Sequence, residues 1–144
     1  MYKRQLLRKP ELWVYSNIET GSVPYASAES TFNRISITER SKLKAEITSN
    51  YSGQISSSTN KQSNPGDSDS TNEYIAITIL LATKKDLILQ NSANNEVITE
   101  ALRILGSISS TDLIALEVIW QPDGEGETLR EEELIIQYPN LKHL

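Results

Sequence analysis

The sequence contains no cysteine among its 144 residues, and this absence removes several kinds of chemistry at once. Disulfide cross-links, thiol catalysis and cysteine-rich zinc sites all need that side chain. The single histidine, His143, stands one residue before the end, where we expect a frayed tail rather than a proton-transfer or metal-binding group. The sequence therefore offers little for nucleophilic or metal chemistry.

Long apolar runs and an excess of basic residues are also lacking. The longest apolar run, residues 75–82, is far shorter than the ~20 residues that cross a bilayer. The charged start has no apolar segment of a secretory signal. The formal net charge of −5 argues against nonspecific nucleic-acid binding, which needs a basic surface. We expect a soluble fragment without a nucleic-acid partner.

Known enzyme motifs are missing as well. We find no nucleophile elbow, no serine–lysine pairing with its supporting motifs and no glycine-rich phosphate loop. We therefore predict no catalytic residue, no cofactor-binding residue and no metal ligand, and we see no evidence of a small-molecule ligand.

Charged residues are concentrated in two places. Near the C-terminus six carboxylates cluster: Asp123, Glu125, Glu127, Glu131, Glu132 and Glu133. Their spacing does not match an EF-hand loop, and acidic residues before and within a first helical turn complement the helix dipole. The second place is Glu39-Arg40-Ser41-Lys42, a solvated helix face or a docking surface. As a partner-contact surface we select Glu39, Arg40, Lys42, Asp123, Glu125 and Glu127.

Residues 6–50 are predicted to form the helical part of one domain. Residues 6–15 read as a short irregular piece around Pro10 or the tail of a helix. Helical spacing begins at Ala28. Ser36 and Glu39 have the spacing of a capping box, which predicts a break near Ser36 and a second helix over residues 37–49, with Asn50 as its stop.

Residues 51–73 are rich in serine and asparagine and nearly free of large apolar side chains. Such a composition buries too little surface to offset the entropy of ordering. This tract first suggests a boundary between two domains. Because neither flanking part carries a sufficient core alone, we interpret it as a long disordered loop inside one domain.

Residues 74–144 are predicted to hold a strand, a helix and a second strand. Residues 74–83 are apolar on both faces, which is typical of an interior strand. N-cap candidates at residues 92–95 and a stop at Gly106 frame the helix, and residues 113–121 form the second strand. A βαβ unit with a right-handed crossover follows. A capping box at Thr128 predicts a short helix that ends before Pro139.

The predicted fold class is therefore α+β: N-terminal helices packed with a small sheet containing a βαβ unit, and a short C-terminal helix. Residues 1–5 read like a translated sequencing adapter joined to the native sequence. We therefore expect these residues to be foreign and the native protein to continue upstream.

The ordered segments together resemble the domain-of-unknown-function 1517 family of cyanobacteria and plant plastids. A relative of this family acts in the acclimation of chloroplasts to fluctuating light. The resemblance covers nearly everything after Gln5. It rests on the order and spacing of six motifs: Phe32-Asn33, Glu39-Arg40-Ser41-Lys42, Leu105-Gly106-Ser107, Glu117-Val118 with Trp120, Glu125-Gly126-Glu127-Thr128-Leu129 and Tyr138-Pro139-Asn140-Leu141.

This resemblance implies a longer protein that is associated with the thylakoid or plastid-envelope membrane and acts in photosynthetic light acclimation. It implies membrane-protein partners of the photosynthetic apparatus and supplies no catalytic residues. The leading hypothesis is thus a non-enzymatic regulatory or adaptor domain. Two alternatives stay open: an enzyme with an unrecognised small-molecule site, and a structural module that homo-oligomerises through a strand edge.

Overall fold

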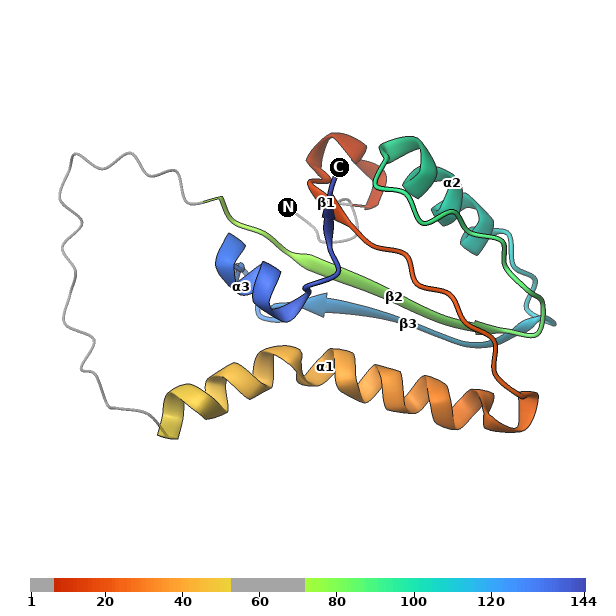
Figure 1. The fold of residues 1–144 in the computed structure, drawn as a ribbon, viewed down its shortest axis with the longest axis horizontal. Helices are drawn as coiled ribbons and strands as arrows, with labels where there is room; N and C mark the ends of the chain where they lie inside the picture. Colours follow the sequence, from red (N-terminus) through yellow and green to blue (C-terminus); the bar gives the residue numbers. More distant parts are fainter. Residues whose placement is uncertain (1–6, 53–71) are drawn as a thin grey trace, which may run out of the picture.

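The computed structural model describes residues 7–52 and 72–144, and these residues form a mixed α+β fold, as the sequence predicts. A long helix, α1, lies along a two-stranded sheet, and two shorter helices lie around that sheet (Figure 1). Two predictions concern residues outside the described ranges. These are the foreign origin of residues 1–5 and the disorder of the polar tract over residues 53–71.

The sheet consists of β2 (Ala76–Thr83) and β3 (Leu113–Gln121), which run antiparallel. Ala76 pairs with Gln121 at one end, and Thr83 pairs with Leu113 at the other. The order strand, helix, strand is as predicted, but the βαβ unit with its parallel strands is wrong. With two strands in this sheet, β2 is also not the predicted interior strand, and each of its residues keeps partial exposure.

The path between the strands explains their direction. Residues 84–94 run back alongside the sheet without regular structure, and helix α2 (Asn95–Gly106) then returns toward the end of β2 (Figure 1). The chain therefore returns to the end of β2 at which it left the sheet, and β3 starts there and runs antiparallel to β2. There the Lys84 N–H donates to the Asp112 carbonyl oxygen at 2.8 Å. A parallel crossover would instead have to end at the opposite end of β2.

Helix α2 begins and ends where local signals predict. The Asn94 side-chain oxygen accepts the Glu96 N–H at 2.7 Å, which satisfies an N–H at the helix start. At the other end Gly106 is the last helical residue and Ser107 is the C-cap.

Helix α1 (Ala28–Ser52) follows a short 3-10 turn, η3 (Tyr25–Ser27), and runs without the predicted break at Ser36. The Ser36 hydroxyl is not a helix cap, because it donates to Glu117 on β3. The Thr38 hydroxyl bonds back to the Arg34 carbonyl oxygen at 3.0 Å, as hydroxyls inside helices often do. The helix also passes the predicted stop at Asn50 by two residues.

Helix α3 (Glu131–Gln137) starts later than the capping box at Thr128 predicts. Leu129 instead pairs with Tyr74 through two backbone hydrogen bonds of 2.7 and 2.8 Å, which hold the chain extended. Arg130 is the N-cap, and the Glu133 carboxylate accepts its N–H at 2.9 Å. This bond lowers the pKa of Glu133. The helix ends before Pro139, as predicted.

The N-terminal part contains a 3-10 turn, η2 (Pro10–Leu12), which agrees with the irregular piece predicted there. It leads into β1 (Tyr15–Ser16), which pairs antiparallel with β4 (Lys142–His143). His143 is therefore not in a frayed tail. It lies opposite Tyr15, with the two ring centroids 5.2 Å apart in an edge-to-face arrangement.

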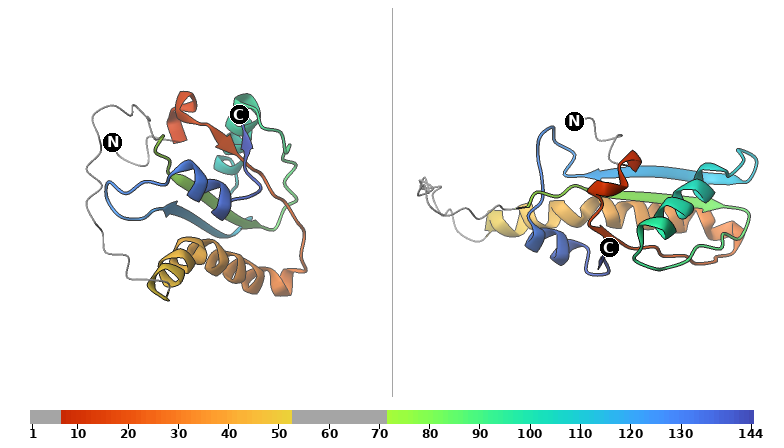
Figure 2. Two further views of the ribbon diagram at one scale, coloured as in Figure 1. Left: turned by 60° about the vertical axis from the view of Figure 1, so that its left-hand side comes forward. Right: turned by 90° about the horizontal axis from the view of Figure 1, so that it is seen from above.

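The most deeply buried hydrophobic cluster comprises Leu129, Leu134 and Tyr138. Partly buried residues from distant segments pack against it: Tyr15, Tyr74, Ala76 and Leu141. The core therefore sits where α3 meets the start of β2. On the sheet, α1 packs against both strands and lies across one face, which the two views in Figure 2 show.

Candidate functional site

Glu39 and Lys42, predicted as contact residues, lie largely shielded from solvent on α1. Their side chains form an ion pair of 2.9 Å, and the Lys42 ammonium lies 4.5 Å from the centre of the Tyr138 ring. Burial, with a smaller contribution from the nearby Glu39 carboxylate, raises the pKa of Tyr138. These side chains join α1 to the end of α3, whereas the Arg40 side chain is 63% exposed.

Arg40 belongs to a polar link between α1 and β3. Its guanidinium pairs with one oxygen of the Glu117 carboxylate, and the buried Ser36 hydroxyl donates to the other. A carboxylate in an apolar strand needs such partners, because burying an unpaired charge is costly. The sequence marks Glu117 as unusual for this reason but does not identify which residues would pair with it.

Gln121 forms a second polar link at the end of β3. Its side-chain NH₂ donates to the Glu39 carbonyl oxygen at 2.9 Å and lies 3.4 Å from that of Arg40. The loop that follows β3 therefore leaves the sheet beside residues 39–40 of α1. The structure thus brings the two halves of the predicted contact surface, from α1 and from the acidic loop, to the same end of the molecule.

The acidic loop, residues 123–127, is built around two glycines. Gly126 has φ = +76°, a conformation that glycine adopts without steric cost. At Gly124 an added Cβ would clash with the Glu127 carboxyl group, so the missing side chain leaves room for that carboxylate. Asp123, Glu125 and Glu127 are all exposed. Among the described residues, no group of three or more histidines, aspartates or glutamates is placed to hold a metal ion.

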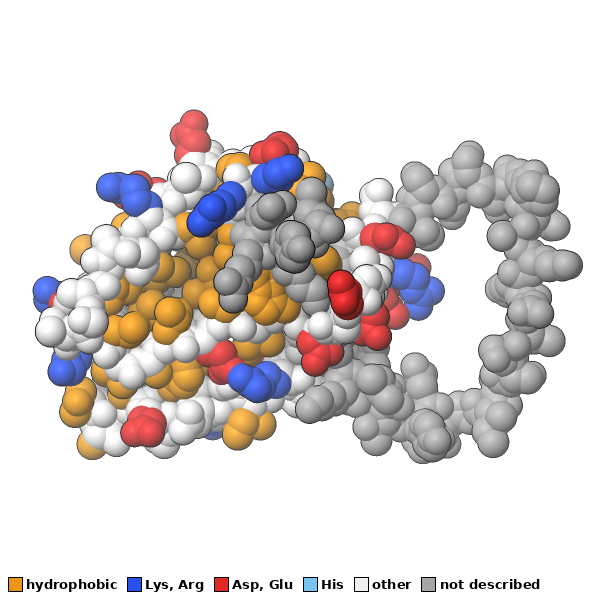
Figure 3. Space-filling model, turned by 180° about the vertical axis from the view of Figure 1, so that it is seen from behind, with side chains coloured by type: hydrophobic (Ala, Val, Ile, Leu, Met, Phe, Trp, Pro, Cys, Tyr) orange, Lys and Arg blue, Asp and Glu red, His pale blue; other side chains and the backbone are white. Residues whose placement is uncertain are grey.

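The outer face of the sheet, on the side away from α1, is apolar and contains the paired residues Ile77/Trp120, Ile79/Val118 and Leu81/Leu116. Leu116 is 53% exposed and Val118 is 39% exposed. Figure 3 shows a broad group of hydrophobic side chains on one side of the molecule, with Asp and Glu side chains gathered toward its right-hand end. The apolar pattern of residues 113–121 does not distinguish a covered strand from an exposed one, so the sequence contains no signal for this exposure.

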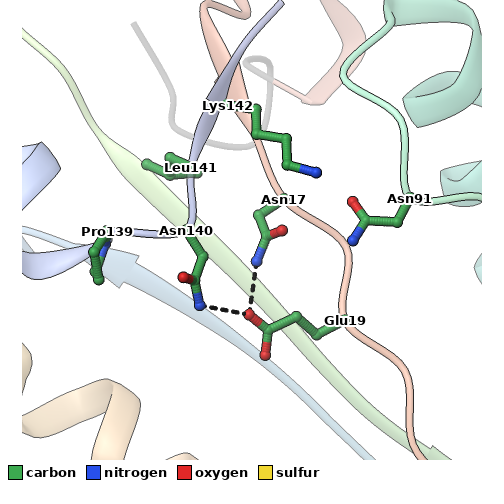
Figure 4. A pocket seen from close by; sticks show the side chains of 7 residues that line it. All are labelled: Asn17, Glu19, Asn91, Pro139, Asn140, Leu141 and Lys142. Carbon is green, nitrogen blue, oxygen red and sulfur yellow. Dashed lines mark hydrogen bonds between the residues drawn. The ribbon is translucent and has the colours of Figure 1, made fainter.

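A polar hollow of about 420 Å³ lies on another part of the surface. It is lined by Asn17, Glu19, Asn91, Pro139, Asn140, Leu141 and Lys142. One oxygen of the exposed Glu19 carboxylate accepts hydrogen bonds from the side-chain amides of Asn17 at 2.8 Å and Asn140 at 3.0 Å (Figure 4). The bonds between these groups fix the carboxylate, but the lining contains no cysteine, serine or histidine to act as a nucleophile or base.

No described helix is long and apolar enough to cross a membrane.

Comparison with known proteins gives two curated relatives. The chain is 38% identical over 142 residues to "Protein FLAP1 homolog A" of Synechocystis sp., covering 95% of this chain and 43% of the relative. It is 35% identical over 141 residues to "FLUCTUATING-LIGHT-ACCLIMATION protein 1, chloroplastic" of Arabidopsis thaliana, covering 96% of this chain and 35% of the relative. The chain thus spans less than half the length of either relative. Neither name describes an enzyme.

No solved structure matches this chain. A sequence model described as "Protein of unknown function (DUF1517)" matches residues 3–144, which is nearly the whole chain. Together with the two relatives, this match confirms the resemblance that the motifs indicated: the chain belongs to the DUF1517 family, whose cyanobacterial and chloroplast members include named light-acclimation proteins.

Proposed function

We propose that this chain is a non-enzymatic regulatory or adaptor domain that acts in photosynthetic light acclimation by binding a partner protein. The biological setting comes from the relatives, one of which is named for acclimation to fluctuating light. The binding role rests on one observation: the outer sheet face is apolar, and β3 exposes Leu116 and Val118 to solvent in the middle of it. Exposed apolar patches of this kind mark interaction sites in soluble proteins.

The polar hollow supports an enzymatic role less well. Catalytic sites combine a concave pocket with convergent reactive groups. In the hollow, the Glu19 carboxylate already accepts two amide donors, and the remaining lining is made of amides, one lysine and apolar side chains. The exposed sheet face therefore carries the proposal.

In the full-length protein we place this domain beside the thylakoid or plastid-envelope membrane, with membrane proteins of the photosynthetic apparatus as its partners. The relatives extend well beyond the matched region, and their names point to cyanobacteria and chloroplasts. Membrane association is assigned to the whole protein, and the partner contact to this domain. The partner surface would combine the outer sheet face with Arg40 and the acidic loop, all near β3.

The test is affinity purification of the tagged full-length protein from cyanobacterial thylakoids, with three versions of this domain. The first is unchanged, the second carries Val118→Asp on the outer sheet face, and the third carries Ile88→Asp. Ile88 is 89% exposed and lies in the segment after β2, so it controls for the loss of any exposed apolar side chain.

We expect the unchanged protein and Ile88→Asp to recover the same membrane proteins of the photosynthetic apparatus, and Val118→Asp to lose them. Recovery of no such protein by the unchanged version would contradict the proposal. Equal recovery by all three versions would show that the partner binds elsewhere.

A further inference from the structure

β3 has a free outer edge in the described part of the chain. It pairs with β2 along one side only, and no other described strand pairs with it. The right-hand view in Figure 2 shows β3 along the margin of the sheet, with β2 on its inner side. Helix α1 packs against both strands from one face of the sheet. The outward backbone N–H and C=O groups of an edge strand are a template for another strand.

The side chains beside this edge would favour an apolar partner strand. Leu116 and Val118 project on the outer face and are the most exposed apolar residues of β3. A strand added to the edge would place every second side chain next to these two residues. Those positions of the partner should therefore be β-branched or aromatic, while the alternate positions can be polar.

Charge at one end of the edge would favour basic residues at that end of the partner. β3 runs directly into the exposed acidic loop, and the acidic start of α3 follows, so residues 123–133 carry six carboxylates and a single arginine. That arginine, Arg130, already lies 3.4 Å from Glu133. A partner segment with lysine or arginine at this end would gain from charge complementarity.

A second copy of this chain fits the edge less well. Two β3 strands paired antiparallel about their centre would place Glu117 opposite Glu117, and like charges directly opposite each other destabilise a strand pair. Each copy also carries a net charge of −5, which opposes association. A basic partner strand avoids both costs.

We infer that the partner adds an extended strand to the outer edge of β3 and pairs antiparallel with it, as β2 does on the other side, because antiparallel pairing is slightly more stable per residue. The partner strand carries lysine or arginine residues first and alternating apolar residues after them, because antiparallel pairing brings its N-terminal end to the acidic loop. This inference rests on the proposed binding function and specifies the chemistry of the partner at that same face.

The test is selection of random peptides of about ten residues, comparable to the length of β3, displayed on phage and bound to the purified chain. The strongest synthetic peptide is then measured by fluorescence anisotropy against the unchanged chain, Val118→Asp, Ile88→Asp and the double variant Glu125→Gln/Glu127→Gln. Circular dichroism confirms that each variant is folded. Amide hydrogen exchange with and without peptide reports whether outward N–H groups of β3 gain protection.

We expect enriched peptides to carry basic residues before alternating apolar residues. Val118→Asp should weaken binding by roughly tenfold or more, whereas Ile88→Asp should leave it unchanged. The double variant should weaken binding several-fold at low salt, a difference that about 0.5 M salt removes. β3 amides should exchange more slowly in the complex.

Four results would overturn the inference: no enriched peptide, enriched peptides without this pattern, equal binding by Val118→Asp and the unchanged chain, or a dimer of this chain whose β3 edge is protected without peptide. Each can occur while thylakoid proteins are still lost from Val118→Asp in the purification experiment. In that case the binding function stands and the strand chemistry fails. If the peptide result fails and Val118→Asp also still recovers the thylakoid proteins, the proposed binding function at this face is wrong as well.

Discussion

The two faces of the β2–β3 sheet carry different chemistry, although they are formed by alternate residues of the same strands. On the α1 side, Glu117 and Gln121 are bonded to the helix, and Ile119 between them is buried. On the outer side, Leu116 and Val118 are apolar and remain exposed. Along this part of β3 the polar side chains thus lie on the covered face beside buried Ile119, and the exposed apolar side chains lie on the outer face.

The polar groups on the covered face fix the position of α1, and the exposed apolar side chains on the outer face support the proposed binding role. Hydrogen bonds and ion pairs have strict geometry, so the links from Ser36 and Arg40 to Glu117 set where the helix lies along the strand. An exposed apolar face gains nothing for the isolated chain, which is consistent with a binding surface.

Substitutions in the hydrophobic cluster should lower the free energy of unfolding most, because its side chains are buried whereas those of the outer sheet face are exposed. Leu134 is 3% exposed, and Leu134→Ala should lower the free energy of unfolding by roughly 2–4 kcal/mol through lost burial and a cavity. Ile136→Ala is the matched control, because Ile136 lies in the same helix and is 69% exposed. Urea denaturation followed by circular dichroism measures both. Similar costs would mean that α3 does not pack as described.

The link between α1 and β3 should contribute less than the cluster. Ser36→Ala removes one of the donors to Glu117 and should cost about 1–2 kcal/mol, because the carboxylate keeps Arg40 as a partner. Ser41→Ala is the control on the same helix, since Ser41 is exposed and bonds only within α1. We expect that change to stay within about 0.5 kcal/mol. Equal effects of the two substitutions in denaturation would show that the link does not stabilise the fold.

A third effect follows from Tyr15, which packs against the hydrophobic cluster and donates a hydrogen bond to the Glu131 carboxylate. This bond, with smaller contributions from burial and the same negative charge, raises the pKa of Tyr15 to about 12. The folded state then holds this proton more tightly than the unfolded state. The associated stability is complete below about pH 10 and is lost as the pH rises toward 12.

Alkaline spectrophotometric titration tests the Tyr15 prediction. Tyr15→Phe should remove one phenol from the part of the curve near pH 12 and leave the part near pH 10 unchanged. Loss of absorbance change near pH 10 instead would show that the contact with Glu131 is not maintained in solution.

The smallest effect belongs to the outer face. Val118→Thr keeps the side-chain shape and removes apolar surface that is already partly exposed, so the free energy of unfolding should change by less than about 0.5 kcal/mol. The same denaturation assay measures it. A loss above about 1 kcal/mol would indicate that the outer face is packed within the isolated chain, and the contrast between the two faces would then disappear.

Local signals predicted much of the fold. Asn94 and Gly106 bracket α2, and Pro139 limits α3, because caps and prolines act on their immediate neighbours. The family could also be recognised from its motifs. The acidic loop was identified as an exposed charged segment, although its position beside α1 depends on the bond from Gln121 to a carbonyl oxygen 82 residues away in sequence.

The remaining features depend on contacts between distant residues. Ser36 looked like a helix cap because its partner, Glu117, lies 81 residues away. The direction of β3 depends on the path of residues 84–94, which has no periodic pattern. Exposure of Leu116 and Val118 could not be read from an apolar strand, since the pattern is the same whether or not another element covers it.

The pairing of β1 with β4 has a consequence for how this domain is synthesised. The Tyr15–His143 pair joins residues from opposite ends of the sequence, and the Leu144 N–H donates to the Val14 carbonyl oxygen at 2.8 Å. A ribosome releases Tyr15 long before His143 exists, so this pair closes only after translation of the whole segment. Until then Tyr15 lacks its partner in β4, whereas its contacts with Tyr74 and Glu131 involve residues that are synthesised earlier. The domain therefore cannot complete its fold before residues 142–144 have been synthesised.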